Sequence, residues 1–150
     1  MSKIKYVKDF VRNINPEYKV KYGNIFEVDI IEEKIFITFN KHQEEDAMVQ
    51  EFIEKEFGKK YNTFLIGLLH EIGHIETYDE VLDEQRDITY GLLKMAFNNG
   101  EADIKEYNNS YFYIPAEYNA TKWAVEYYEN HIQECEALIQ NLKGANKNEI

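Results

Sequence analysis

Apolar residues recur at three- and four-residue steps over much of the chain, which is the spacing of helices that bury one face. The helices predicted from this pattern span residues 3–13, 43–57, 61–78, 81–97 and 115–142. In 81–97 the apolar side consists of Ile88, Leu92, Met95 and Ala96. Asn98-Asn99-Gly100 is a helix stop signal, and Pro115 marks the start of the last helix. We interpret 101–114 as irregular, with a loop at Asn108-Asn109-Ser110 and an apolar run over 111–114 that either packs or lines a cleft.

Between residues 18 and 39 the pattern changes to alternation of apolar and charged residues, as in half-buried strands. Gly23-Asn24 and Glu32-Glu33 interrupt the alternation and divide it into three strands. We therefore predict an α+β fold in which a small three-stranded antiparallel sheet packs on a bundle of helices. The length suits a single domain, predicted over 1–143, followed by a polar tail at 144–150 that we expect to be disordered.

The strongest chemical signal is His70-Glu71-Ile72-Gly73-His74, which lies inside the predicted helix 61–78. Histidines four residues apart share one helix face and can bind the same zinc ion, while the intervening glutamate can take a proton from a water on the metal. Leu65, Leu68, Leu69, Ile72 and Ile75 form a separate apolar stripe that would bury the other side. A glycine in mid-helix is unfavourable, and close approach of a neighbouring element would explain Gly73.

A catalytic zinc usually has three protein ligands, so a third is expected elsewhere in the chain. The candidates are Cys135, His42, His131 and Glu117. Glu117 is favoured because it follows Pro115 in the first turn of a helix, where a carboxylate suits the helix dipole. Ala120 and Ala124, within two turns of it, would let that helix pack closely on the histidine helix. His131 would lie about 21 Å further along the helix, too far to share the ion.

Two segments, Leu68–Tyr78 and Pro115–Val125, resemble the paired motifs of the gluzincin metallopeptidases, in particular the ImmA/IrrE-type family. The second segment matches at Glu117, Ala120, Trp123 and Ala124. It departs at Thr121, where the family usually has Asn or Asp that supports a zinc-binding histidine; Thr121 can still accept a hydrogen bond from an imidazole N–H, as a weaker partner. The resemblance covers about 20 residues.

The resemblance implies a zincin-like fold and a cytoplasmic zinc endopeptidase. Zn²⁺ would be held by His70, His74 and Glu117, with Glu71 as the catalytic base. The implied substrate is a protein or peptide, such as a regulatory or repressor protein. An edge strand of the predicted sheet could pair with an extended substrate.

Composition limits the kinds of partner and the cellular compartment that we expect for this chain. The net charge of −11 opposes direct nucleic-acid binding, which needs a basic surface. No apolar run approaches the roughly 18 residues of a membrane helix, and the N-terminus lacks the apolar core of a signal peptide. The single cysteine, Cys135, excludes an internal disulfide and fits a reducing cytoplasm; we expect it to be a buried small hydrophobe.

Two further questions remain open at the level of sequence. Tyr78, Tyr90, Tyr111 and Tyr113 are all candidates to stabilise an oxyanion, and the sequence does not choose among them. The alternative function is a catalytically weak or inactive zincin-fold protein that acts as a protein-binding module. Thr121 favours this alternative, whereas Glu71 opposes it because metal binding alone needs no general base. A deformylase is set aside, since its cysteine ligand precedes the histidines and Cys135 follows them.

Overall fold

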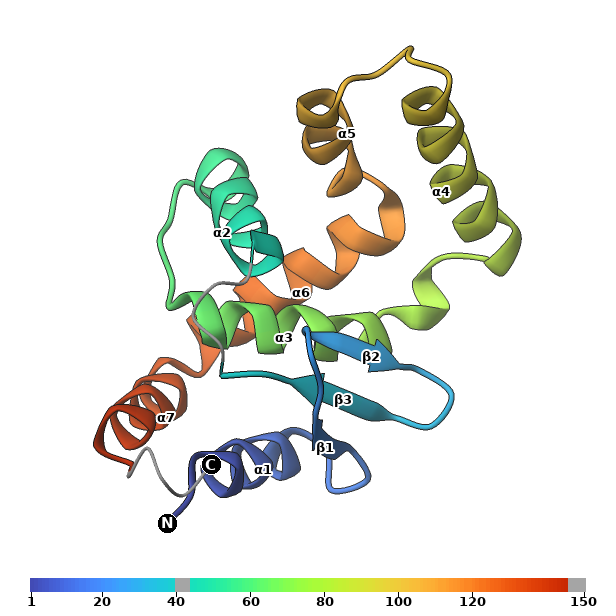
Figure 1. Ribbon diagram of the computed structural model, residues 1–150. Helices are drawn as coiled ribbons and strands as arrows, with labels where there is room; N and C mark the ends of the chain where they lie inside the picture. Colours follow the sequence, from blue (N-terminus) through green and yellow to red (C-terminus); the bar gives the residue numbers. More distant parts are fainter. Residues whose placement is uncertain (40–43, 146–150) are drawn as a thin grey trace.

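The helix that carries both motif histidines, α3 (Thr63–Glu76), lies at the centre of the molecule (Figure 1). Asn62 begins the helix, because its side-chain oxygen accepts a hydrogen bond from the backbone N–H of Leu65 at 3.0 Å. The predicted stripe is buried at Leu65, Leu68, Leu69 and Ile72, and Ile66 is buried as well. A helix that is apolar on so many sides must be covered on several sides. Its covers are α6, α2 and the sheet.

The computed structural model describes residues 1–39 and 44–145, apart from the side chains of 44–47. Within these ranges the fold is mixed α and β, with seven α-helices and one three-stranded sheet. The other elements are α1 (Lys3–Ile14), β1 (Lys19–Tyr22), β2 (Glu27–Asp29), β3 (Lys34–Ile37), α2 (Glu44–Phe57), a 3-10 helix (Tyr78–Glu80), α4 (Asp83–Asn98), α5 (Ile104–Tyr111), α6 (Pro115–Asn130) and α7 (Ile132–Gly144). The predicted tail lies outside the described residues from 146 onward.

The sheet is mixed, so the predicted antiparallel meander is wrong in its topology. The strand order is β1-β3-β2, with β1 parallel and β2 antiparallel to β3. The prediction assumed that Gly23-Asn24 closes a hairpin. Instead the chain crosses the end of β3 there: the Gly23 N–H donates to the Ile37 carbonyl at 2.8 Å, and a Cβ on Gly23 would lie 3.0 Å from the Phe36 Cβ. β3 is the most apolar strand, with Ile35 and Ile37 fully buried, and its central place covers it on both edges.

The second predicted turn, at Glu32-Glu33, does form a hairpin between β2 and β3. The Asp29 carboxylate accepts a hydrogen bond from the Glu32 N–H at 3.0 Å, and Glu33 adopts a left-handed φ of 53°. This arrangement leaves β2 on the edge of the sheet beside α3 (Figure 1).

Two helix predictions also need correction. Residues 101–114 are not irregular throughout, because α5 spans Ile104–Tyr111 and Asp103 caps it by accepting from the Glu106 N–H at 2.8 Å. The last predicted helix breaks at His131 into α6 and α7. There the His131 ring stacks on Tyr127 at 3.9 Å between centroids, and its Nδ1 lies 2.9 Å from the Tyr127 carbonyl. The break turns α7 back onto α1.

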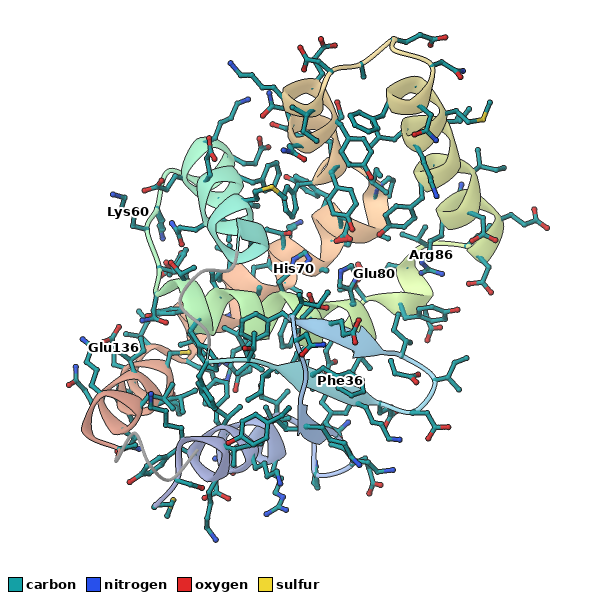
Figure 2. The ribbon with its side chains drawn as sticks, viewed as in Figure 1. Phe36, Lys60, His70, Glu80, Arg86 and Glu136 are labelled. Carbon is teal, nitrogen blue, oxygen red and sulfur yellow. The ribbon has the colours of Figure 1, made fainter. Side chains whose placement is uncertain are left out.

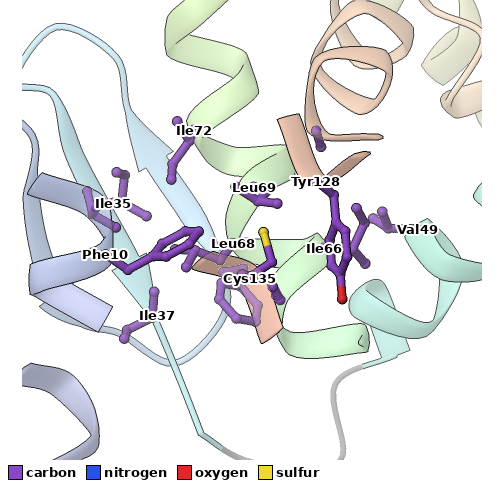
Figure 3. Packing of buried hydrophobic residues seen from close by; sticks show 14 of the residues in the cluster. Phe10, Ile35, Ile37, Val49, Ile66, Leu68, Leu69, Ile72, Tyr128 and Cys135 are labelled. Atoms are coloured by element: carbon purple, nitrogen blue, oxygen red, sulfur yellow. The ribbon is translucent and has the colours of Figure 1, made fainter. Parts of the chain in front are cut away.

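The core lies between α3, the sheet and the terminal helices. Figure 3 shows Leu68 and Leu69 of α3 with Ile35 and Ile37 of β3, Phe10 of α1 and Cys135 of α7. Cys135 is free and fully buried, as predicted, and it is not part of the group of described residues that could hold a metal ion. Among residues 1–39 and 44–145, no helix has both the length and the apolar character needed to cross a membrane.

α4 and α5 form an arm that stands apart from this core (Figure 1). Neither helix has a buried residue along its length, and α4 packs chiefly on α5. The predicted apolar side of α4 faces solvent: Ile88, Leu92 and Met95 are 59%, 61% and 59% exposed. The opposite side of the arm forms a wall of the site described next.

Candidate metal centre

The site is built where α3 crosses α6. Gly73 of α3 touches the backbone of α6 directly: a Cβ at this position would lie 3.0 Å from the Cα of Ala120 and closer still to its carbonyl oxygen. Ala120 and Ala124 are both fully buried at this contact. The small residues predicted from the sequence therefore bring the two backbones together, and the His70–His74 face of α3 meets Glu117 in the first turn of α6.

Three ligand atoms converge at this crossing. Glu117 Oε2 lies 3.0 Å from His70 Nε2 and 2.8 Å from His74 Nε2, and the two nitrogens are 3.2 Å apart. A tetrahedral zinc ion with bonds of about 2.0–2.1 Å separates its ligand atoms by about 3.3 Å, so small outward shifts would fit it. The structure thus brings together three of the sequence-predicted residues as a group able to hold a metal ion. Figure 2 shows His70 beside α3 near the middle of the molecule.

Thr121 fixes the orientation of the His70 ring. Its hydroxyl donates to the Glu117 carbonyl at 2.9 Å, and His70 Nδ1 lies 3.0 Å from the Thr121 hydroxyl oxygen itself. The single hydroxyl proton is used, so Thr121 accepts the N–H of His70 Nδ1. With Nδ1 engaged in this way, Nε2 is the ring nitrogen whose lone pair would be offered to a bound metal ion. Thr121 is thus a neutral hydrogen-bond partner that orients the His70 ring.

Replacing Thr121 with valine is therefore expected to weaken metal binding by about 10–100-fold, the usual effect of losing a partner that orients a ligand. Valine keeps the shape of this fully buried side chain but cannot accept the imidazole proton. Thr121→Ser is the matched control, since it keeps the hydroxyl. Competition titration with a zinc chelator measures both variants. Equal affinity of Thr121→Val and wild type would show that the contact does not orient His70.

Glu117 is flanked by two tyrosines as well as by the histidines. Tyr90 of α4 donates to Glu117 Oε1 at 3.0 Å, and Tyr111 of α5 lies near the same carboxylate. Burial alone would raise the pKa of Glu117, but hydrogen bonds to His70 and His74 hold that pKa well below its usual range. Burial, with the adjacent carboxylate, raises the pKa of both tyrosines, so they remain protonated donors. Glu117 therefore stays ionised, as a ligand must.

A pocket of about 500 Å³ opens in front of these ligand atoms. Glu71 lines it together with both histidines and Glu117. The other walls are the edge strand β2 with its flanks, the start of the described part of α2, and the inner side of the arm; they contribute Phe26, Glu27, Val28, Ile30, Met48, Val49, Arg86, Tyr90, Tyr107, Asn108, Tyr111 and Phe112. Figure 2 labels Arg86 at the first turns of α4. The pocket thus joins the metal-ligand atoms, a carboxylate and a strand edge.

The structure divides the four tyrosine candidates into two that line the pocket and two that do not. Tyr90 and Tyr111 line the pocket near Glu117, and Tyr90 donates a hydrogen bond to it. Tyr78 and Tyr113 donate to Asp83 and Glu56 at 2.8 Å and 2.7 Å, and neither lines the pocket. Two of the four hydroxyls thus belong to residues that line the pocket in front of the candidate ligand atoms.

Some pocket residues were missed by reasoning from sequence, chiefly those of α5. Tyr107 and Tyr111 are four residues apart and Asp103 precedes them as a cap, which together indicate a helix, whereas the polar residues Asn108-Asn109-Ser110 led to the prediction of a loop. Phe112, whose ring centroid lies 6.0 Å from that of His70, was predicted only as part of an apolar run beside the cleft. His131 stacks on Tyr127 away from the site, and His42 lies outside the described residues.

No family model matches this chain, and neither the curated proteins nor the solved structures include a significant match to it. The candidate metal centre therefore rests on the chemistry and geometry of its own residues.

Proposed function

We propose that this protein is a zinc-dependent peptidase with a zincin-like arrangement. The observation that carries the proposal is the convergence of three acceptor atoms, from His70, His74 and Glu117, within 3.2 Å of one another in a buried site. Acceptors this close repel unless a cation or protons lie among them. Two imidazoles and one carboxylate are a preferred donor set for a catalytic zinc, which keeps a fourth position open.

In this proposal the metal ion, Glu71 and the two tyrosines have separate roles. A bound zinc ion would supply Lewis-acid chemistry, acidifying a water and polarising a peptide carbonyl. Glu71, beside the ligands in the pocket, accepts the proton of the attacking water and passes it to the departing amine. Tyr90 and Tyr111 are protonated donors next to Glu117 and are placed to stabilise developing negative charge.

The walls of the pocket support an extended peptide as substrate. β2 has β3 on one edge only, and Glu27 and Val28 of β2 line the pocket. A peptide that pairs with the free edge of β2 would pass beside Glu71 and the ligand atoms, as in strand-addition recognition. Phe26 and Phe112 offer apolar contacts for its side chains. The substrate we propose is an extended segment of a protein. Regulatory proteins, which the resemblance implies as substrates, belong to this class.

Metal content tests the proposal directly. Wild-type protein reconstituted with zinc and freed of excess metal is expected to retain zinc in native mass spectrometry, whereas His74→Ala and Glu117→Ala are expected to lose it. Glu126→Gln, an exposed position on the same helix as Glu117, is the control that should retain the metal. Failure of folded wild type to retain zinc would overturn the proposal. Retention by Glu117→Ala alone would remove Glu117 from the ligand set.

The alternative, a binding module without turnover, remains a second proposal because Thr121 is a neutral partner for His70. It predicts a zinc-loaded protein that captures peptides at the β2 edge and releases them intact. Product analysis after incubation with a peptide library separates the two proposals.

A further inference from the structure

The outer side of α4 carries an apolar stripe with no cover among the described residues. Ile88, Leu92 and Met95 follow at four- and three-residue steps, so they lie on one face of the helix. All three are more than half exposed. At about 100° per residue, Tyr90 lies on roughly the opposite side, toward Glu117. The stripe therefore faces away from the pocket, and a peptide bound there would not cover it.

Gly91 lies in the middle of this stripe. Glycine is disfavoured in a helix interior. Gly73 is explained by a close contact, because Ala120 of α6 leaves no space for a Cβ at that position. Gly91 has no such neighbour: among the described residues, nothing lies within 4 Å of where its Cβ would be. A second helix backbone at this point would give Gly91 the same role that α6 gives Gly73.

The charged residues beside the stripe are complementary to the same residues in a second copy of the helix. Asp87 and Lys94 are exposed, flank the stripe on the same side and are seven residues apart. In an antiparallel pair of identical helices crossing near Gly91, each flank faces the same flank of the other copy with the residue order reversed. Asp87 then faces Lys94 of the other helix, and Lys94 faces its Asp87. In the described structure neither residue forms an ion pair within its own chain.

From these three observations we propose that α4 is a dimerisation helix, which pairs antiparallel with α4 of a second copy across a two-fold axis near Gly91. Ile88, Leu92 and Met95 would form the apolar centre, and the two Asp87–Lys94 pairs would fix the register. A single helix pair buries less than the 800 Å² or so per partner of a typical stable interface. The dimer is therefore a concentration-dependent equilibrium, opposed by the net charge of −11.

Sedimentation velocity of the whole chain over a wide concentration range, at about 0.15 M salt to screen the net charge, tests the proposal. Wild type should shift from monomer to dimer as concentration rises. Leu92→Glu should raise the dimer Kd by about tenfold or more. Ile31→Glu is the matched control, because Ile31 is 94% exposed on the turn between β2 and β3 and should leave the Kd unchanged.

A charge exchange distinguishes this pairing from other modes of association. Asp87→Lys and Lys94→Asp should each weaken the dimer, and the double variant should restore it, since both facing pairs are then rebuilt with reversed sign. Circular dichroism of each variant controls for folding, and all these positions are exposed. A monomer at every concentration would overturn the proposal. A dimer that is insensitive to Leu92→Glu, or not restored by the double exchange, would do so as well.

Discussion

Replacing Glu71 with glutamine is expected to lower peptide hydrolysis by about 10²–10⁴-fold while leaving zinc content unchanged. Glutamine has nearly the same shape, and Glu71 lies beside the three ligand atoms without being one of them. The substitution removes only the ability to accept a proton from water. The measurement pairs metal content with mass-spectrometric product analysis of a peptide library digested by zinc-loaded protein.

Two comparisons make this experiment decisive. His74→Ala should lose zinc and hydrolysis together, whereas Glu126→Gln, which changes an exposed glutamate remote from the pocket, should keep both. Hydrolysis by Glu71→Gln at the wild-type rate would refute the role of Glu71. A wild-type protein that holds zinc but cleaves no peptide would favour the binding module.

Gly73→Ala is expected to cost about 2 kcal/mol or more of unfolding free energy, although alanine normally gains about 1 kcal/mol over glycine in a helix interior. The new methyl group would meet the backbone of Ala120, and a backbone cannot move aside as a side chain does. α3 and α6 would have to separate, which also moves Glu117 away from the histidines. Chemical denaturation and zinc titration should therefore show losses of stability and of metal affinity together.

Gly91→Ala is the control for this experiment, since its Cβ meets no described atom within 4 Å. Measured at low concentration, where the protein is monomeric, it should raise unfolding free energy by up to about 1 kcal/mol. The same substitution in two helices of one protein should thus have opposite signs. A Gly73→Ala variant as stable as wild type would show that the α3–α6 contact yields more easily than its geometry indicates.

The grouping of the candidate metal-binding residues was predictable from sequence because its signals are local and chemical. His70 and His74 share a helix face by periodicity, and Glu117 is marked by the proline before it and the small residues after it. The contact behind Gly73 was expected for the same reason, and the structure confirms it. Each inference needed only a helix and its repeat.

The predictions from sequence were wrong for features that the local hydrophobic pattern does not determine. The alternation in 18–39 identifies strands but not their neighbours, and the structure places β3, whose Ile35 and Ile37 are fully buried, between β1 and β2. α5 was missed because its asparagines outweighed its cap and its aromatic spacing. The break at His131 depends on α7 packing against α1, a contact between opposite ends of the chain.

The arm formed by α4 and α5 gives the pocket a wall whose stability is separate from that of the core. Its helices have no buried residue, so opening them exposes little apolar surface and costs less than unfolding α3 or α6. Amide protons of the arm should exchange with solvent by local opening, while those of α3 exchange only through global unfolding. Tyr90 donates to Glu117 from this wall and Tyr111 lies near the same carboxylate, so each opening also moves both hydroxyls away from this candidate metal ligand. Access to the pocket and the environment of Glu117 are thus governed by one local equilibrium.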